Sequence, residues 1–145
     1  MFEHILIATD GSEVAAKAVS AGLELAKNLA ARVVVMTASE PWYALVNAET
    51  IAIHFPADEY ERATKEEAAR ILGEVRAQAL TLGIECQTLH VTNFPAEAII
   101  ETAKANACDL IVMGSYGRGG IARLLLGSQA TKVVTLSSVP VLVCR

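Results

Sequence analysis

Short apolar runs and amphipathic helical stretches alternate along this chain, and that alternation limits its fold more than any other feature. The first run, His4–Thr9, is short, apolar and partly β-branched, which is typical of a buried strand. Glu13–Ala30 follows with its apolar residues on one face of a helix, and Ser12 stands where an N-cap is expected. Arg32–Ala38 then repeats the strand pattern. Strands that are apolar on both faces and alternate with helices indicate a parallel sheet covered on both sides.

The rest of the chain continues the alternation. A long helix is predicted to open at Asp58, with Glu61 completing a capping box, and to stop at Gly83. Pro95 suits the first turn of the next helix. The other predicted elements are a strand at Ile84–Val91, the helix from Pro95 through Ala103, a strand at Asp109–Met113, a helix at Ser128–Leu136 and a strand at Val139–Cys144.

The segment Ser39–Ala57 interrupts the regular pattern. It contains two prolines and is unusually apolar for a connection. Long loops in compact domains often act as lids or binding loops, so this segment is the predicted moving part. The alternative is a loop that packs onto its own domain.

Composition narrows the class of protein. The chain has 145 residues, of which 53% are hydrophobic and 19% charged, which fits one domain with a full core and excludes disorder. The net charge of -4 argues against a broad basic face for nucleic acid. We see no secretory signal and no apolar run long enough to span a bilayer. We expect a single domain, residues 1–145, in a soluble cytoplasmic protein without membrane insertion.

The cysteines and histidines suggest no catalytic or metal site. Neither set has metal-ligand spacing, so we predict no metal held by protein side chains alone. The cysteines are expected to be reduced, buried thiols of a cytosolic protein. The residues concerned are Cys86, Cys108, Cys144, His4, His54 and His90.

Glycines gather between the fourth predicted strand and the last predicted helix. Four of the nine glycines fall between Gly114 and Gly120, and a fifth is Gly127. Glycine lets main-chain amides approach an anion closely, and consecutive amides form an anion-binding nest. A helix beginning at Ser128 adds free N–H groups and the positive end of its dipole. The segment therefore predicts an anion site, to which Arg118 and Arg123 can add charge; a tight turn alone remains the alternative.

Two common phosphate motifs are absent, so the segment is neither a P-loop nor a dinucleotide fingerprint. Asp10, at the end of the first strand, is placed to hold a ribose hydroxyl or a phosphate-bound Mg²⁺. A turn in which Asp10 and Ser12 cap the first helix is an equally open interpretation.

The spacing Gly114-x2-Gly117-x9-Gly127-Ser128 resembles the ATP-binding motif of the universal stress protein family. The resemblance covers the whole chain and includes ILIATDGS at Ile5–Ser12, PAEAI at Pro95–Ile99, DLIVMGS at Asp109–Ser115 and VPVLV at Val139–Val143. It implies an open, doubly wound five-stranded parallel sheet of order 3-2-1-4-5, with helices on both faces, like that of the adenine nucleotide alpha hydrolases.

The same resemblance implies a site for ATP, ADP or AMP, which Mg²⁺ can accompany. Ala38 would lie beside the adenine, the glycine segment would wrap the ribose and phosphates, and Ser128 would close the phosphate end. The full implied set is Ala8, Thr9, Asp10, Ala38, Gly114, Ser115, Tyr116, Gly117, Arg118, Gly119, Gly120, Gly127, Ser128, Gln129 and Ala130. Tyr116, Thr37-Ala38 and Gln129 depart from the residues that are more frequent in the family.

The leading functional interpretation is an ATP-binding stress-response module that regulates a protein partner. One alternative is a slow ATPase or phosphoryl-transfer enzyme, although no base or catalytic lysine marks the segment. Another is an interaction module without nucleotide. The last strand, Val139–Cys144, predicts a homodimer because a bare apolar edge strand invites antiparallel pairing. A loop of the same chain covering that edge is the alternative.

Overall fold

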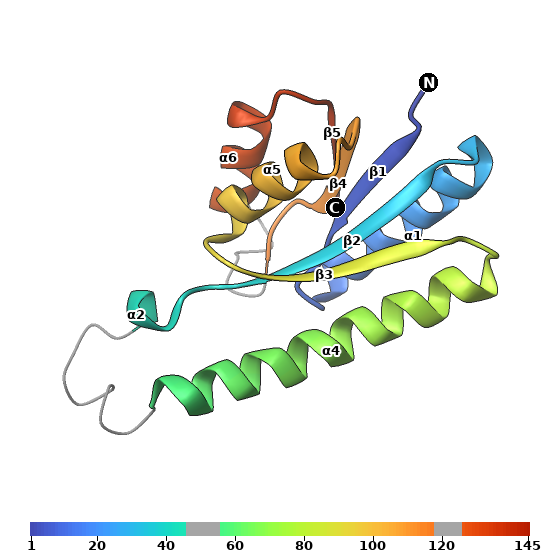
Figure 1. Ribbon diagram of the computed structural model, residues 1–145. Helices are drawn as coiled ribbons and strands as arrows, with labels where there is room; N and C mark the ends of the chain where they lie inside the picture. Colours follow the sequence, from blue (N-terminus) through green and yellow to red (C-terminus); the bar gives the residue numbers. More distant parts are fainter. Residues whose placement is uncertain (46–55, 118–125) are drawn as a thin grey trace.

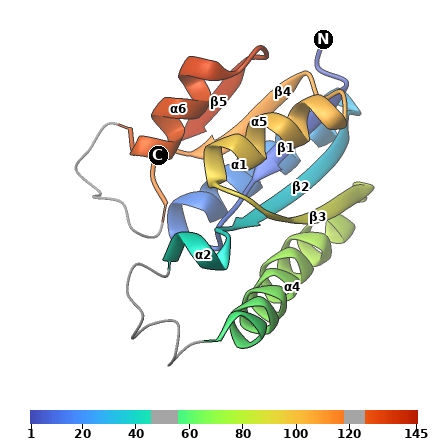
Figure 2. The same cartoon turned by 60° about the vertical axis from the view of Figure 1, so that its left-hand side comes forward.

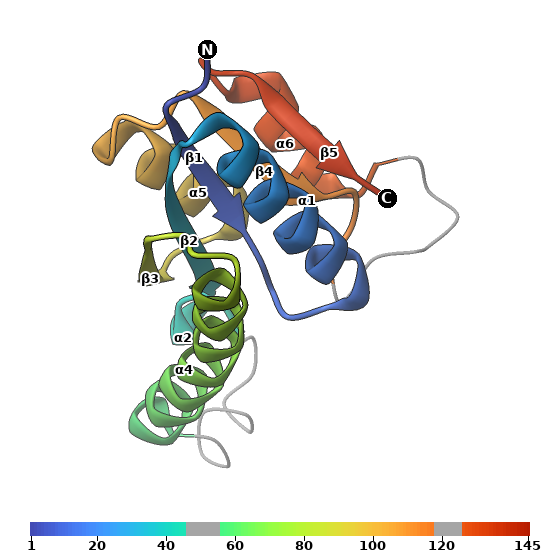
Figure 3. The ribbon, with the colours of Figure 1, turned by 90° about the vertical axis from the view of Figure 1, so that its right-hand side faces the viewer.

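Five parallel strands form the centre of the molecule (Figure 1). The computed structural model describes residues 1–45, 56–117 and 126–145. Its strands run in the order β3-β2-β1-β4-β5, which confirms the predicted sheet. They are β1 (His4–Ala8), β2 (Arg32–Ser39), β3 (Cys86–Thr92), β4 (Leu110–Gly114) and β5 (Val141–Cys144). The two edge strands, β3 and β5, lie at opposite sides of the sheet (Figure 3).

Helices cover both faces of the sheet. Figure 2 shows α5 and α6 in front of the sheet and α1 behind it. The helices of the described residues are α1 (Glu13–Leu29), α2 (Trp42–Leu45), α4 (Ala57–Thr81), α5 (Pro95–Ala105) and α6 (Ser128–Leu136). Helices α1 and α4 pack on one face, and α5 and α6 pack on the other.

The strands divide the core into two layers. Successive strand side chains point to opposite faces, so Ile5 and Ile7 pack with α1 and α4 while Leu6 packs with α5 and α6. All three side chains are fully buried. This arrangement explains why the strand sequences are apolar throughout rather than alternating.

Local capping agrees with the sequence at some helix ends and not at others. The Ser12 hydroxyl accepts a hydrogen bond from the Ala15 amide at 3.2 Å, which confirms the predicted cap of α1. The predicted capping box at Asp58 is wrong: α4 begins at Ala57 behind Pro56, and no side chain caps it. Asp58 lies inside the first turn instead, where a carboxylate faces the positive end of the helix dipole.

Several boundaries also differ from the predictions. The segment Ser39–Ala57 is not a continuous connection, because β2 includes Ser39 and α2 follows; residues 46–55 lie outside the described part. Strand β3 begins after Ile84, whose amide is held by the Ala79 carbonyl in the C-terminal turn of α4. Strand β5 begins after Val139, whose amide donates to the Ser137 hydroxyl at 3.1 Å.

The three cysteines are free thiols. Burial raises the pKa of each, to about 11 for Cys108, where the Asp109 carboxylate adds to the effect. These thiols therefore remain protonated at neutral pH and are poor nucleophiles. Among the described residues, no three His, Cys, Asp or Glu side chains gather as a metal site requires. None of the described helices is both long and apolar enough to span a membrane.

Candidate functional site

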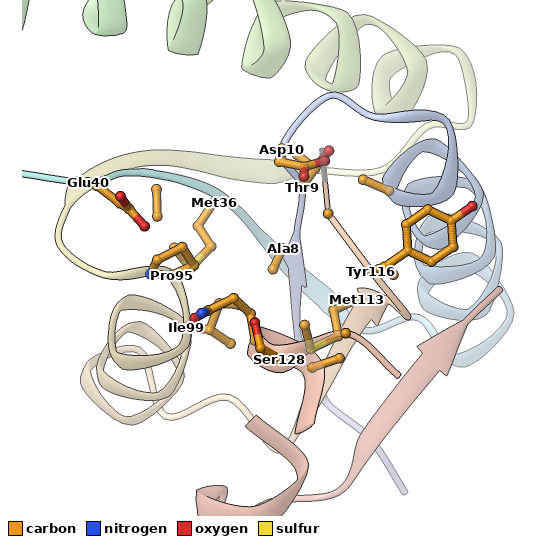
Figure 4. A pocket seen from close by; sticks show the side chains of 17 residues that line it. Ala8, Thr9, Asp10, Met36, Glu40, Pro95, Ile99, Met113, Tyr116 and Ser128 are labelled. Atoms are coloured by element: carbon orange, nitrogen blue, oxygen red, sulfur yellow. The ribbon is translucent and has the colours of Figure 1, made fainter. Parts of the chain in front are cut away.

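A pocket of about 480 Å³ opens at the carboxyl ends of β1, β2 and β4 (Figure 4). The chain leaves β1 for α1 on one face of the sheet and enters β4 from α5 on the other. The order of the strands reverses between β1 and β4, and open α/β sheets bind ligands in the crevice at such a point. The N-terminal turns of α5 and α6 close the pocket from the side.

One part of the pocket is apolar. Met36 of β2 and Met113 of β4, the strands on either side of β1, point to the face that α5 and α6 cover, and both are buried. Pro95 and Ile99 add the first two turns of α5. Together these side chains form an apolar wall, which is common in sites for small ligands.

Strand β2 extends beyond β1, and this leaves a pair of main-chain groups facing the pocket. Among the described residues, the last hydrogen bond from the β1 side to β2 joins the Thr9 amide to the Met36 carbonyl at 3.0 Å. Further along β2, the Ser39 carbonyl accepts from the Asn93 amide on the β3 side. Residues alternate in direction along a parallel strand, so Ala38 turns its N–H and C=O toward the β1 side. Neither group has a main-chain partner among the residues that the structure describes.

Main-chain amides gather at the opposite part of the pocket, at the start of α6. The first N–H groups of a helix have no partner within it. In the described part of the chain, the amides of Ser128, Gln129 and Ala130 have no acceptor. Gly127, by contrast, donates to the Ser115 carbonyl at 2.6 Å. Among the described residues of this part of the pocket, the helix end therefore offers three free main-chain donors.

Gln129 has a second task that the sequence did not reveal. Its side-chain oxygen accepts a hydrogen bond from the Ala96 amide at 3.1 Å, so it caps the N-terminus of α5 from the first turn of α6. This bond fixes the two helix ends against each other. The Gln129 side chain thus positions the wall of the pocket.

Asp10 forms the turn that the sequence left open as an alternative. Its Oδ1 accepts from the Ser12 amide at 2.9 Å, and the Thr9 hydroxyl accepts from Gly11 at 3.1 Å. The other carboxylate oxygen lies beside Gly117, because a Cβ built on Gly117 would stand 2.8 Å from Asp10 Oδ2. The turn and an approach to the pocket are therefore compatible.

The three motif glycines answer different steric needs. A Cβ on Gly114 would lie 2.9 Å from Val14 Cγ1 and 3.3 Å from the Ala15 main-chain nitrogen, so α1 packs directly against it. A Cβ on Gly127 would lie 3.2 Å from Tyr116 Cα. A Cβ on Gly117 would meet, among the described residues, only the Asp10 side chain. Gly117 is thus the glycine that borders open space in the pocket.

Most of the residues implied by the sequence lie around this one pocket. They are Ala8, Thr9, Asp10, Ala38, Gly114, Tyr116, Gly117, Gly127, Ser128, Gln129 and Ala130. Ser115 does not line it: this residue is 1% exposed and its amide donates to the Cys144 carbonyl at 2.7 Å. Arg118, Gly119 and Gly120 lie outside the described residues.

Sequence reasoning missed six residues that line the pocket, namely Ala15, Met36, Glu40, Pro95, Ile99 and Met113. For Met36 and Met113 a clue was available, since each lies near the carboxyl end of its strand and points to the face that α5 and α6 cover. Glu40 had none, because it follows the predicted strand in a segment without a pattern. Asp10 and Glu40 carry the formal charges of the lining, and no Lys or Arg lies among its described members.

Comparison with known proteins gives one consistent result. The model of the universal stress protein family matches residues 1–145. The chain is 33% identical over 148 residues to the universal stress protein YxiE of Bacillus subtilis, and 37% identical over 147 residues to a universal stress protein of Thermus aquaticus. Both alignments cover the whole of each chain.

Solved structures agree with this result. The hypothetical protein MJ0577 of Methanocaldococcus jannaschii superposes with a TM-score of 0.80 at 27% identity, covering 99% of this chain and 96% of that one. A universal stress protein in complex with cAMP superposes with a TM-score of 0.74 at 28% identity, covering 99% and 97%. By fold, whole-chain family match and sequence identity, this chain belongs to the universal stress protein family.

Proposed function

We propose that this protein binds ATP in the pocket at the carboxyl edge of the sheet and acts as a nucleotide-dependent regulatory module in a stress response. One observation carries the proposal: an apolar wall, a main-chain donor and acceptor without a partner in the described part of the chain, and a helix N-terminus surround the same 480 Å³ space. The relative that was solved with cAMP, an adenine nucleotide, supports it.

Adenine fits the base end of the pocket. Its N1 accepts a hydrogen bond and its 6-amino group donates one, which complements the N–H and C=O of Ala38. Met36 and Ile99 offer apolar contact to the ring faces. Buried donors and acceptors discriminate strongly because a wrong base leaves them unpaired.

The phosphates are assigned to the amides at the start of α6. Helix N-termini bind anions through free N–H groups and the helix dipole, and the Ser128 hydroxyl adds a donor. The carboxylates of Asp10 and Glu40 oppose a bare polyphosphate. We therefore assign Mg²⁺ to the bound nucleotide, where it offsets the like charges.

ATP with Mg²⁺ is expected to raise the melting temperature of the protein by several degrees, and EDTA is expected to remove about half of that gain. A ligand at a hundred times its Kd stabilises the folded state by about 2.7 kcal/mol. The repulsion from the two carboxylates should weaken the binding of Mg²⁺-free ATP by about tenfold, which is about 1.4 kcal/mol. Differential scanning fluorimetry measures both effects. An unchanged melting temperature with ATP, ADP and AMP would contradict the proposal.

Two other functions give different results in simple assays. Steady, multiple-turnover release of phosphate would favour an ATPase or phosphoryl-transfer enzyme. A protein that retains no nucleotide after purification, as judged by mass spectrometry of the denatured sample, and that is not stabilised by any would favour a nucleotide-free interaction module.

Regulation is assigned to the segment that follows Ala38. A ligand shifts a conformational equilibrium only by its difference in affinity for the two states. Because Ala38 and Glu40 line the pocket, occupancy acts directly on the start of Ser39–Ala57. We propose that this segment presents the surface for a protein partner, and that the protein works in the cytoplasm, where its free thiols stay reduced.

We also propose a homodimer formed by antiparallel pairing of β5. This strand is an edge, and Leu142 is 39% exposed. The carbonyls of Pro140 and Cys144 accept hydrogen bonds from the β4 side of the sheet. Main-chain groups alternate in direction along a strand, so those of Val141 and Val143 point away from β4. Their N–H and C=O groups are those available to a second copy of the chain.

Val143→Pro is expected to convert the dimer to a monomer without unfolding it. Proline removes the outward N–H but no hydrogen bond to β4, and edge strands tolerate it on that side. Light scattering after size-exclusion chromatography measures the mass, and circular dichroism checks the fold. A folded Val143→Pro protein that remains dimeric would exclude this interface.

A further inference from the structure

Glu40 places a carboxylate at the base end of the pocket. In Figure 4 its side chain lies on the same wall as Met36 and Pro95, apart from Asp10 and Tyr116. It directly follows Ser39, the last residue of β2, and stands two residues after Ala38; both Ala38 and Glu40 line the pocket. The position therefore brings a charged acceptor next to the main-chain pair of Ala38.

Two hydrogen bonds to the main-chain carbonyls of Ser39 and Glu40, and one to the Ser39 side chain, hold this part of the chain in place. The Tyr60 hydroxyl of α4 donates to the Glu40 carbonyl at 2.6 Å. Ser39 Oγ and His90 Nε2 lie 2.8 Å apart, and the Asn93 amide donates to the Ser39 carbonyl at 3.0 Å. Burial and the nearby charge of Glu40 raise the pKa of Tyr60, so the phenol remains a donor at neutral pH. Tyr60 is a positioning residue for Glu40.

The chemistry of a carboxylate limits what it can recognise. An ionised glutamate only accepts hydrogen bonds, so it favours a ligand that offers N–H or O–H at this end and disfavours one that offers a carbonyl. The 6-amino group of adenine carries two N–H bonds. If the first donates to the Ala38 carbonyl, the second remains to be satisfied.

We propose that Glu40 is a specificity-determining residue that accepts the second N–H of the base's 6-amino group. Its preferred ligands are 6-aminopurine nucleotides. This inference rests on the proposed function, since it assigns the base to the Ala38 end. A hydrogen bond to a charged acceptor is stronger than one between neutral groups, and it adds selectivity to the neutral pair made by Ala38.

The test is a double-mutant cycle between the protein and the ligand. Isothermal titration calorimetry with Mg²⁺ compares ATP with purine riboside triphosphate, which lacks only the amino group, on the wild type and on Glu40→Ala. Glu59→Ala is the matched control, because Glu59 is an exposed glutamate that does not line the pocket. Glu40→Ala keeps the main-chain carbonyl that Tyr60 binds, so the fold is not at risk.

Glu40→Ala is expected to lower the affinity for ATP by about tenfold to a hundredfold. Purine riboside triphosphate should bind Glu40→Ala at least as tightly as it binds the wild type, since the variant lacks the negative charge of Glu40. Glu59→Ala should change neither ligand. Because the contact with Ala38 is common to both proteins, it cancels in the comparison.

Two outcomes would overturn the inference while leaving nucleotide binding intact. One is an equal loss for both ligands in Glu40→Ala, which would mean that the carboxylate does not contact the amino group. The other is GTP bound by the wild type as tightly as ATP and weakened by Glu40→Ala, which would assign the carboxylate to the N1–H and 2-amino groups of guanine. A wild type that binds no nucleotide would instead defeat the proposed function itself.

Discussion

Gly117→Val is expected to abolish ATP binding while the protein stays folded. A Cβ at this position would stand 2.8 Å from Asp10 Oδ2, so the Asp10 side chain must move and the new methyl groups occupy the space beside it. No main-chain atom of the residues that the structure describes lies within 4 Å of that Cβ outside its chain neighbours, and Gly117 is exposed. We expect affinity to fall by at least about a hundredfold, which is about 2.8 kcal/mol, as measured by calorimetry.

Gly73→Val is the matched control for this substitution. Gly73 is exposed in the middle of α4, and a Cβ there meets nothing within 4 Å. ATP affinity should be unchanged in this variant, and circular dichroism should show both variants folded. Normal ATP affinity in a folded Gly117→Val protein would show that the nucleotide does not bind in the pocket to which we assign it.

Gly114→Val is expected to destabilise the whole fold rather than the site alone. Its Cβ would approach Val14 Cγ1 at 2.9 Å, and the main chain of α1 at Val14 and Ala15 at 3.3 Å. A helix main chain cannot move aside as a side chain can, so α1 would have to separate from β4. We expect a loss of about 3 kcal/mol, at the upper end for overpacked cores.

Urea denaturation measures this loss as a lower midpoint at an unchanged slope. Gly114→Ala should fall between the wild type and the valine variant, because it adds the Cβ without the two methyl groups. A Gly114→Val protein with a wild-type midpoint would show that the contact between α1 and β4 yields easily, against our description of the core.

These two glycines show how one motif serves two purposes. The sequence indicates that Gly114 and Gly117 both lie against the ligand, because glycine admits close approach by any neighbour. The structure identifies the neighbours: a helix main chain for Gly114, and the Asp10 side chain for Gly117. The spacing of glycines predicts that something approaches closely but not what it is.

Much of the fold could be predicted because it follows from local periodicity. The apolar runs at β1 and β2, the Ser12 cap of α1 and the start of α6 at Ser128 are each read from a few adjacent residues. The strand order came from family resemblance. The false capping box at Asp58 shows the limit of local patterns, because Pro56 set the start of α4 instead.

The parts of the site that could not be predicted depend on residues far apart in the sequence. The cap that Gln129 provides to Ala96 and the bond from Tyr60 to Glu40 both join separate helices and loops. The exposed pair on Ala38 arises because β2 is longer than β1, which no single segment reveals. Predicting such features requires the register of the sheet.

The central claim is that main-chain N–H groups at the edge of the sheet bind the two ends of an adenine nucleotide. Nuclear magnetic resonance of ¹⁵N-labelled protein tests it most directly, by titration with ATP and Mg²⁺. We predict that the amide resonances of Ser128, Gln129 and Ala130 shift together with that of Ala38, along one saturation curve. If those four amides do not move at saturating ATP, or if the shifts lie on another face, the account is wrong.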